Sequence, residues 1–356
     1  MGLRTDLEQS VRRALTSAGR EYYIHLSSML SDARRLGLIM GSELDCSFDY
    51  WHIPYQGEKL IEHYGYHYNG MMNRSFPGIH PMTVYDLNDG CFILITPPFN
   101  CTRDMTASEA ISLCEDRLEF RIGSMIGDRG VGSIELTRRL AGEEQRVKPM
   151  IYYLAIKANS ILRKHVRGRG WVTDEETGER ACIRKGLDYH GVKTNLIALS
   201  KEDRRNPGKR RRIFLFITKD ESKNPFDVLQ HYRMRGEHER NLGCFSALGV
   251  KHLPSTESDE EIAGHLLIFM KLQFLFKLLM KRLEIGKCEP KTLSNLLLRK
   301  PGISWIERAP DGKVCHRTII FTNRALIKKI GKTTLDLNGH EITLIEQWRS
   351  SKARAR

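Results

Sequence analysis

Three acidic residues stand where a folded chain can bring carboxylates together. Asp49 ends an expected strand, Asp128 ends a second strand just before a glycine-containing turn, and Glu239 lies on an expected helix. Ligands gather at strand ends in open α/β sheets, and a cluster of hard oxygen donors there suits magnesium or manganese. Two such ions can serve phosphodiester transfer. Taken singly, each residue is equally an ordinary cap or turn carboxylate.

The segment before Glu239 adds two polar residues to the same face of one expected helix. At about 100° per residue, Arg235 lies about 40° from Glu239 and Tyr232 about 20° away on the other side. A carboxylate for metal, a guanidinium for phosphate and a phenol for a backbone contact could together handle a phosphate group. The alternative is a surface Arg–Glu pair beside a packed tyrosine.

The elements that must position these residues follow from hydrophobic spacing, turn signals and caps. They are, in chain order, helical residues 5–35, a strand over 44–49, a turn over 53–57, a hairpin over 83–96, a helix over 106–121, a strand over 122–126, a helix over 133–141, a mostly β region over 151–218, and helices over 227–248 and 259–283. This order predicts an α/β fold with a β-rich insertion before the last candidate carboxylate.

The composition predicts a globular protein with an acidic partner. Apolar residues make up 40% of the 356, which excludes disordered and fibrous classes. The net charge of +14 favours nucleic acid as the partner, although charge can serve solubility alone. The eight cysteines form no CxxC pair, which argues against a zinc ribbon and for reduced cytosolic thiols.

Targeting and membrane signals are not expected. The first nine residues carry charges and lack the apolar core of a secretory signal. The most apolar stretch, 262–283, is interrupted by Lys271, Lys277, Lys281 and Arg282, so we expect a core helix and not a membrane span.

Two basic runs within the β-rich region fit a DNA-binding surface, because each cation on a phosphate releases counterions. They cover residues 163–169 and 204–212, and the candidate DNA contacts among them are Arg167, Arg169, Arg210, Arg211 and Arg212. The alternative is a solvated charged loop.

The spacing Tyr232-x2-Arg235-x3-Glu239 resembles the Tyr-Arg-Glu signature of DDE transposases from bacterial and archaeal insertion sequences. Its surroundings, from Gln230 to the Leu248-Gly-Val-Lys-His-Leu-Pro-Ser loop, are similar to that family's third-carboxylate helix and the loop after it.

Two earlier motifs agree with this resemblance in the right order. Ser47-Phe-Asp49-Tyr-Trp-His-Ile-Pro-Tyr-Gln-Gly resembles the first-carboxylate strand, and Met125-Ile-Gly-Asp128-Arg-Gly-Val resembles the second. The similarity runs from about residue 40 to about residue 285.

The resemblance implies an RNase H-like core that cleaves DNA and transfers strands at transposon ends. Asp49, Asp128 and Glu239 would hold two Mg²⁺ or Mn²⁺ ions, and Tyr232 and Arg235 would position the phosphate backbone. The implied partners are inverted-repeat and target DNA, bound by a homodimer, with no membrane. The implied location is the nucleoid in a prokaryotic cytoplasm.

Five segments follow from these predictions. They are an N-terminal helical segment (1–40), the first part of the core (41–150), the β-rich insertion (151–218), the closing helices of the core (219–286) and a basic C-terminal segment (287–356). About 48 residues precede Asp49, enough for two helices and hardly a full DNA-end-binding domain, so we expect a shortened copy or end recognition elsewhere.

The sequence departs from the family pattern at two places. The subgroup often has Lys seven residues after the Glu, where this chain has Ser246, and the nearest downstream lysine is Lys251. Some relatives stack a flipped base on a Trp in the insertion, and Trp171, far upstream of Glu239, is the only Trp there.

The alternatives are a metal-dependent nuclease without strand transfer and an inactive DNA-binding remnant of a transposase. Asp45 and Glu237 are the fallback carboxylates. Asp45 shares the strand parity of Asp49, and Glu237 lies two residues before Glu239, about 160° away around the helix.

Overall fold

A computed structural model describes the chain as two compact units. The first consists of Met1–Leu242 and His252–Met270, and the second of Gly243–Lys251 and Lys271–Arg356. The described residues are 2–54, 65–69, 74–98, 105–142, 150–168, 170–202, 211–247, 258–284, 302–308, 314–322, 324–330, 333–337 and 340–346.

A nine-stranded mixed sheet organises the first unit, in the order β6-β5-β1-β7-β8-β12-β11-β10-β9. Its strands are β1 (Glu43–Tyr50), β5 (Met82–Asp86), β6 (Cys91–Ile95), β7 (Arg121–Gly127), β8 (Ile151–Ile156), β9 (Val172–Thr173), β10 (Arg180–Tyr189), β11 (Val192–Glu202) and β12 (Arg211–Thr218). Strands β1, β7 and β8 run parallel, and the other neighbouring pairs are antiparallel. The expected α/β class is confirmed.

The predicted hairpin and strands in the first half of the chain are present. The hairpin β5–β6 turns at the Asp-Gly pair, where Gly90 adopts a φ of 67° that favours glycine. The strands expected over 44–49 and 122–126 are β1 and β7. The turn expected over 53–57 differs at its start, because Ile53–Pro54 forms the short strand β2, and its remaining residues lie outside the described part.

The region over 151–218 is rich in β structure, as predicted, and it continues the central sheet. Strand β8 pairs with β7 on one side and with β12 on the other. The strands of the expected insertion and those that carry Asp49 and Asp128 therefore belong to one hydrogen-bonded sheet.

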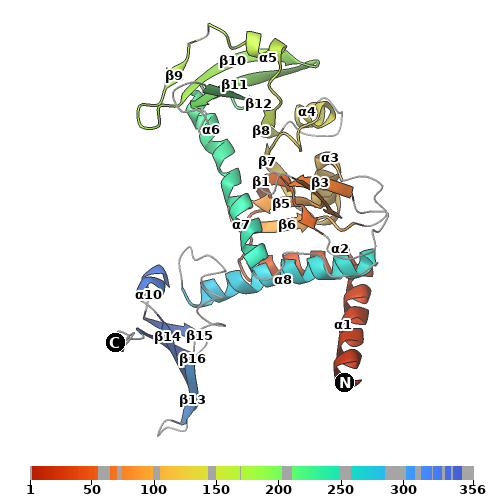
Figure 1. Ribbon diagram of the computed structural model, residues 1–356, viewed down its shortest axis with the longest axis vertical. Helices are drawn as coiled ribbons and strands as arrows, with labels where there is room; N and C mark the ends of the chain where they lie inside the picture. The colour runs from red at the N-terminus through yellow and green to blue at the C-terminus, as the bar shows by residue number, and fades with distance from the viewer. Residues whose placement is uncertain are drawn as a thin grey trace, which may run out of the picture. The chain divides into compact units, whose positions relative to one another are not determined.

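The N-terminal helices are α1 (Gly2–Arg20) and α2 (Tyr22–Arg35), as the apolar spacing predicts. Tyr22, Leu26 and Leu30 recur every four residues and are buried. The hydroxyl of Tyr22 donates to the carbonyl of Ile95 at 2.5 Å, which ties α2 to β6. Figure 1 shows α2 running beside this end of the sheet.

Helix α8 (Asp259–Arg282) crosses α1 closely. A Cβ at Gly264 would lie 2.2 Å from the carbonyl oxygen of Leu15, so only glycine allows this approach. Of the described helices, α8 alone is long and apolar enough to cross a membrane, and 44% of that window is buried inside the protein. Since buried core helices meet the same criteria, this length and composition do not indicate a span.

Two helices between the strands begin at side-chain caps. Helix α3 (Ala107–Ser112) starts at Thr106, which exchanges hydrogen bonds with Glu109 in a capping box. A π-helical turn (Leu113–Arg117) follows, and the helix expected over 106–121 ends there, because Arg121 already belongs to β7. Helix α4 (Ile134–Leu140) begins at the predicted cap Ser133.

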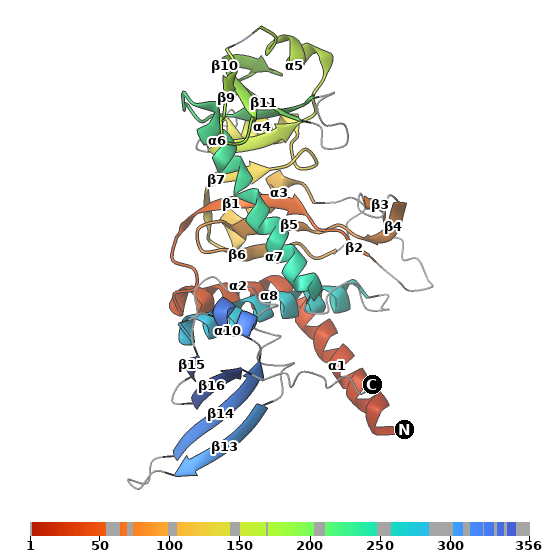
Figure 2. The ribbon, with the colours of Figure 1, turned by 60° about the vertical axis from the view of Figure 1, so that its left-hand side comes forward.

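One predicted helix is broken in two. The spacing predicts a single helix over 227–248, whereas the structure has α6 (Pro225–Arg233) and α7 (Arg235–Ala247), separated by a turn at Met234. Figures 1 and 2 show α6 beside the strands β9–β12 and α7 continuing in the same direction past β1, β5 and β6.

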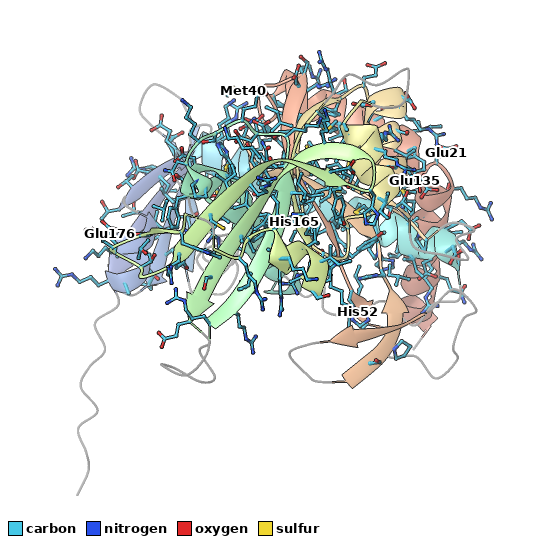
Figure 3. All side chains as sticks on the ribbon, turned by 90° about the horizontal axis from the view of Figure 1, so that it is seen from above. Glu21, Met40, His52, Glu135, His165 and Glu176 are labelled. Carbon is cyan, nitrogen blue, oxygen red and sulfur yellow. The ribbon has the colours of Figure 1, made fainter. Side chains whose placement is uncertain are left out.

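Smaller elements complete the first unit. Helix α5 (Ser160–Lys164) follows β8, and β2, β3 (Gly65–Asn69) and β4 (Arg74–Ile79) form a three-stranded sheet in the order β2-β4-β3. Seen from above in Figure 3, His52 lies at this small sheet, and His165 lies over the strands that follow β8.

The second unit contains a four-stranded sheet in the order β13-β14-β16-β15. Its elements are β13 (Gly302–Arg308), β14 (Val314–Thr322), α10 (Arg324–Ile330), β15 (Thr334–Leu337) and β16 (His340–Glu346). Its core contains the buried side chains of Leu283, Ile320, Ile330, Leu335 and Leu344. Strands β14 and β16 are parallel, and α10 lies between them in the chain.

Candidate active site

Asp49 and Asp128 lie at the same edge of two neighbouring parallel strands. In the β1–β7 register, Phe48 is opposite Gly127, so the next residue on each strand is one of the two aspartates. A hydrogen bond from a backbone N–H holds each carboxylate, from Tyr50 to Asp49 Oδ1 at 2.9 Å and from Gly130 to Asp128 Oδ1 at 2.7 Å. The remaining oxygen of each carboxylate is therefore available to a third group.

That third group is the guanidinium of Arg235, at the start of α7. Its Nη1 is 2.8 Å from Asp49 Oδ2 and 3.7 Å from Asp128 Oδ2, and its Nη2 is 2.5 Å from Glu239 Oε1. The structure thus brings together all three carboxylates that the sequence singled out, with one cation among them. We call these four residues the carboxylate cluster.

Burial within this cluster differs from one side chain to the next. The side chains of Asp49 and Arg235 are 16% and 17% exposed, whereas that of Glu239 is 54% exposed. Burial raises the pKa of Asp49 from 3.8 to about 6, against the lowering effect of Arg235, and the nearby charge of Asp128 raises it further. Burial thus opposes the negative charge of Asp49, and the guanidinium of Arg235 favours it.

Tyr232 remains next to the cluster although it stands on α6. Tyr232 is the penultimate residue of α6, whereas Arg235 and Glu239 lie on α7, so the expected single helix is interrupted between them. The interruption is the one residue Met234, whose backbone angles remain helical (φ −57°, ψ −24°). The Tyr232 ring packs on Phe216 with centroids 4.5 Å apart, and Arg235 Cζ lies 6.0 Å from the Tyr232 ring centre. Burial raises the pKa of Tyr232, so the phenol stays protonated.

A buried histidine fastens α7 to the sheet. His238 is fully buried, with Nδ1 3.0 Å from Ser47 Oγ and Nε2 2.9 Å from Thr83 Oγ1. Because the Thr83 hydroxyl donates to the Asp49 carbonyl at 2.8 Å, it accepts from Nε2–H, and Nδ1 then accepts from Ser47. Burial, with Arg235 nearby, lowers the pKa of His238 to about 3, which agrees with this neutral tautomer.

The sequence did not lead us to expect the contacts of His238 with Ser47 and Thr83, although strand parity and helix spacing point to them. Ser47 and Asp49 share strand parity, so both point to the face that α7 covers. A second polar contact lies farther along the helix, where the Asn241 amide donates to the Tyr85 hydroxyl at 2.7 Å. Polar residues three apart on α7 thus mark the face that contacts the sheet.

The fallback carboxylates lie outside the cluster. Asp45 accepts hydrogen bonds from Ser124 Oγ at 2.6 Å and from Asn88 Nδ2 at 3.2 Å, four residues before Asp49 on β1. Glu237 forms an ion pair with Arg240 at 3.8 Å. Neither is among the carboxylates that contact Arg235.

The candidate DNA contacts are only partly described. Arg167 and Arg212 are exposed, and Arg211 donates to Ser200 and to the Gly178 carbonyl. Arg169 and Arg210 lie outside the described residues.

The remaining predicted positions lie away from the carboxylates or cannot be compared with them. Trp171 contacts Arg180, whose Cζ is 5.8 Å from its ring centre, and is not among the residues that line the cavity described next. Ser246 belongs to α7, and Lys251 lies outside the described residues.

A cavity of about 550 Å³ opens beside the carboxylate cluster. Its lining combines cations, aromatic rings and two of the carboxylates, and the polar and aromatic residues among it are Asp128, Arg129, Lys201, Phe214, Phe216, Tyr232, Arg233, Arg235 and Glu239. Lys201 and Arg233 both contact Glu179, Lys201 at 2.8 Å. Guanidinium and ammonium groups of this kind bind phosphate oxygens.

The donor set fits a divalent cation in chemistry. Three carboxylates offer the hard oxygens that Mg²⁺ and Mn²⁺ prefer, and they already converge on one cationic group. Within the described part of the chain, no group of three His, Cys, Asp or Glu side chains has the arrangement of a formed metal site. Arg235 takes up carboxylate oxygens that a metal ion would need.

Sequence comparisons assign no relatives to this chain. It matches no protein-family model and no curated protein.

Proposed function

We propose that this protein is a DDE-type transposase that cleaves DNA and joins strands at the ends of an insertion sequence. The observation that carries the proposal is the convergence of Asp49, Asp128 and Glu239 on one point, from two neighbouring strand ends and a helix. Asp49 precedes Arg235 by 186 positions and Glu239 by 190 positions in the chain. These residues have the types and the order that the Tyr-Arg-Glu family uses.

We also propose that the core of the first unit is RNase H-like. In the order β6-β5-β1-β7-β8, the strands β1, β5 and β6 are antiparallel neighbours, and the two later strands β7 and β8 run parallel to β1. The small sheet of β2, β3 and β4 lies between β1 and β5 in the chain. A five-stranded mixed sheet of this kind, with the acids at the ends of β1 and β7, supports this fold. The helix with the third acid follows strands β9–β12, as the resemblance implies.

Each residue of the site has a distinct role in this proposal. Asp49 and Asp128 hold cations from the sheet, and Glu239 does so from the exposed side of α7. Two bound Mg²⁺ or Mn²⁺ ions would supply activation of the attacking oxygen and stabilisation of the leaving oxygen. Arg235 and Tyr232 bind the phosphate, and His238 fixes the helix that carries Glu239.

The partner in this proposal is DNA, both the inverted repeats and the target. The net charge of +14 and the cations that line the cavity support a polyanion. A homodimer that bridges two transposon ends, at the nucleoid of a prokaryotic cytoplasm and without a membrane, belongs to the same proposal. The buried free thiols Cys46, Cys91, Cys114 and Cys182 agree with a reducing compartment.

The test is cleavage of candidate inverted-repeat DNA by the purified protein with Mg²⁺, against Ca²⁺ as a non-supporting ion. Asp49→Asn, Asp128→Asn and Glu239→Gln should each abolish cleavage and retain DNA binding in Ca²⁺, because cations supply most of the affinity. Asp45→Asn is the matched control on the same strand and should cleave normally. Cleavage by Asp49→Asn together with loss in Asp45→Asn would reassign the site.

Two alternative functions are separate outcomes of the same assay. Cleavage without joining of a supplied 3′-hydroxyl end would identify a metal-dependent nuclease. Binding without cleavage at any Mg²⁺ or Mn²⁺ concentration would identify an inactive DNA-binding remnant.

A further inference from the structure

The guanidinium of Arg235 occupies the position where three carboxylates converge. Its two terminal nitrogens lie 2.8 Å, 3.7 Å and 2.5 Å from oxygens of Asp49, Asp128 and Glu239. With 17% of its side chain exposed, Arg235 is an internal partner of these acids and not a surface ion pair. One cation thus neutralises part of a charge that three carboxylates share.

A divalent ion cannot bind the same oxygens without a conflict with this arginine. Mg²⁺ bonds carboxylate oxygens at about 2.1 Å, so an ion on Asp49 Oδ2 would lie no more than about 5 Å from Arg235 Nη1. Two cations at that distance in a partly buried site repel each other strongly. The ion also needs lone pairs that now accept hydrogen bonds from the guanidinium.

The cavity beside the carboxylate cluster is an alternative position for the Arg235 side chain. Arg235 is the first residue of α7, immediately after the turn at Met234, and it lines the cavity of about 550 Å³ together with Tyr232 and Gly236. At Gly236, a Cβ would meet no atom within 4 Å, so the space next to Arg235 is open. Because Arg235 itself lines this cavity, its guanidinium lies beside open space into which the side chain could turn.

A phosphate is the ligand that would draw the guanidinium into the cavity. Arg129, Lys201 and Arg233 also line it, and a planar guanidinium binds phosphate through two parallel hydrogen bonds.

We propose that Arg235 is an exchangeable internal cation that holds the carboxylate cluster together without DNA and leaves it for a DNA phosphate. This inference rests on the proposed function. Its consequence is that divalent-cation binding and DNA binding strengthen each other, because both need Arg235 outside the cluster. By linkage, each ligand then raises the affinity for the other by the same factor.

The test measures metal binding by the full chain without DNA, with Ca²⁺ as the probe in calorimetric titrations. Arg235→Gln removes the competing charge and should bind Ca²⁺ at least about tenfold more tightly than the wild type, a change of about 1.4 kcal/mol. Arg240→Gln is the matched control, since it removes one charge from the same helix at a side chain that is 72% exposed. It should stay within about twofold of the wild type, because exposed charges interact weakly.

A second arm adds a DNA duplex. Ca²⁺ affinity, corrected for binding to DNA alone, should rise for the wild type and not for Arg235→Gln. Because Arg235→Gln leaves three carboxylates facing one another, Arg235→Lys serves as a second variant with the charge retained. A lysine ammonium is a compact point charge and lacks the planar fork with which the guanidinium contacts several carboxylates, so Ca²⁺ affinity should lie between those of the wild type and Arg235→Gln.

The outcomes separate this inference from the proposed function. Equal or weaker Ca²⁺ binding by both Arg235 variants overturns the inference, as does an equal gain in Arg240→Gln, and DNA cleavage by the wild type would then still stand. A gain specific to Arg235 without DNA cleavage supports the inference and counts against the transposase. No Ca²⁺ binding by any variant also overturns the inference, and the cleavage assay then decides the proposed function by itself.

Discussion

The carboxylate of Asp49 should make the metal-free protein less stable as pH rises from about 4 to about 6. Burial raises the pKa of Asp49 from 3.8 to about 6, so in this range the native state holds a proton that the unfolded chain has released. Stability falls with pH wherever the native state binds more protons. The stabilising effect is fully present below pH 3.8 and is lost as pH rises through 6.

The size of this effect follows from the two pKa values. A rise from 3.8 to about 6 corresponds to about 3 kcal/mol, or about 1.4 kcal/mol per pH unit. The value already includes the attraction of Arg235, which lowers the pKa of Asp49 and reduces the effect. Asp49→Asn keeps the shape of the side chain and removes its titration, so the difference between the two proteins isolates this one group.

The assay is urea denaturation in EDTA between pH 4 and pH 7.5, followed by tryptophan fluorescence. Trp51 is buried two residues from Asp49 and reports on this region. The free energy of unfolding of the wild type, minus that of Asp49→Asn, should fall by about 2.5 kcal/mol across this range, because a part of the full effect is already lost at pH 4. In an Arg235→Gln background the fall should move to higher pH. A difference that is constant or rises with pH would refute the reasoning.

Three further predictions concern positioning and binding. Tyr232→Phe removes one hydroxyl and leaves the ring, so single-turnover cleavage should slow by the equivalent of about 0.5–1.5 kcal/mol with an unchanged melting temperature; a large drop in melting temperature would mark the hydroxyl as structural. Replacing Arg210, Arg211 and Arg212 by alanine should weaken binding to all DNA sequences. The slope of log affinity against log salt concentration should fall by the equivalent of up to about three phosphate contacts, and an unchanged slope would assign this basic run to a solvated surface. His238→Ala should cost about 3 kcal/mol of stability in thermal denaturation, through the lost ring and two lost hydrogen bonds; full stability would exclude it as an anchor of α7.

Local signals in the sequence were sufficient to find the strands that carry Asp49 and Asp128. Each strand contains buried residues and is followed by polar or glycine residues, and these signals lie within a few residues of each aspartate. Their order along the chain agrees with two parallel neighbours in one sheet. The third acid, Glu239, was found from the spacing of the Tyr-Arg-Glu motif.

Long-range contacts explain what the sequence did not reveal. No proline marks the break at Met234, and the polar contacts of His238 that hold α7 reach Ser47 and Thr83, more than 150 positions earlier. Spacing rules expect an apolar stripe on a packed helix, whereas among the described side chains of α7 the polar residues His238 and Asn241 contact the sheet. The position of Arg235 among the acids depends on all of these distant partners together.

The shared strand β8 has a mechanical consequence. Because β8 is hydrogen-bonded to β7 and to β12, the end of the sheet with β10–β12 cannot pivot relative to the end that carries Asp49 and Asp128. Neighbouring strands are about 4.8 Å apart, so β12 stays roughly 10 Å from β7. In the proposed function, DNA bound along β12 would therefore stay at a constant offset from the acids, and the bending needed to reach them would come from the DNA.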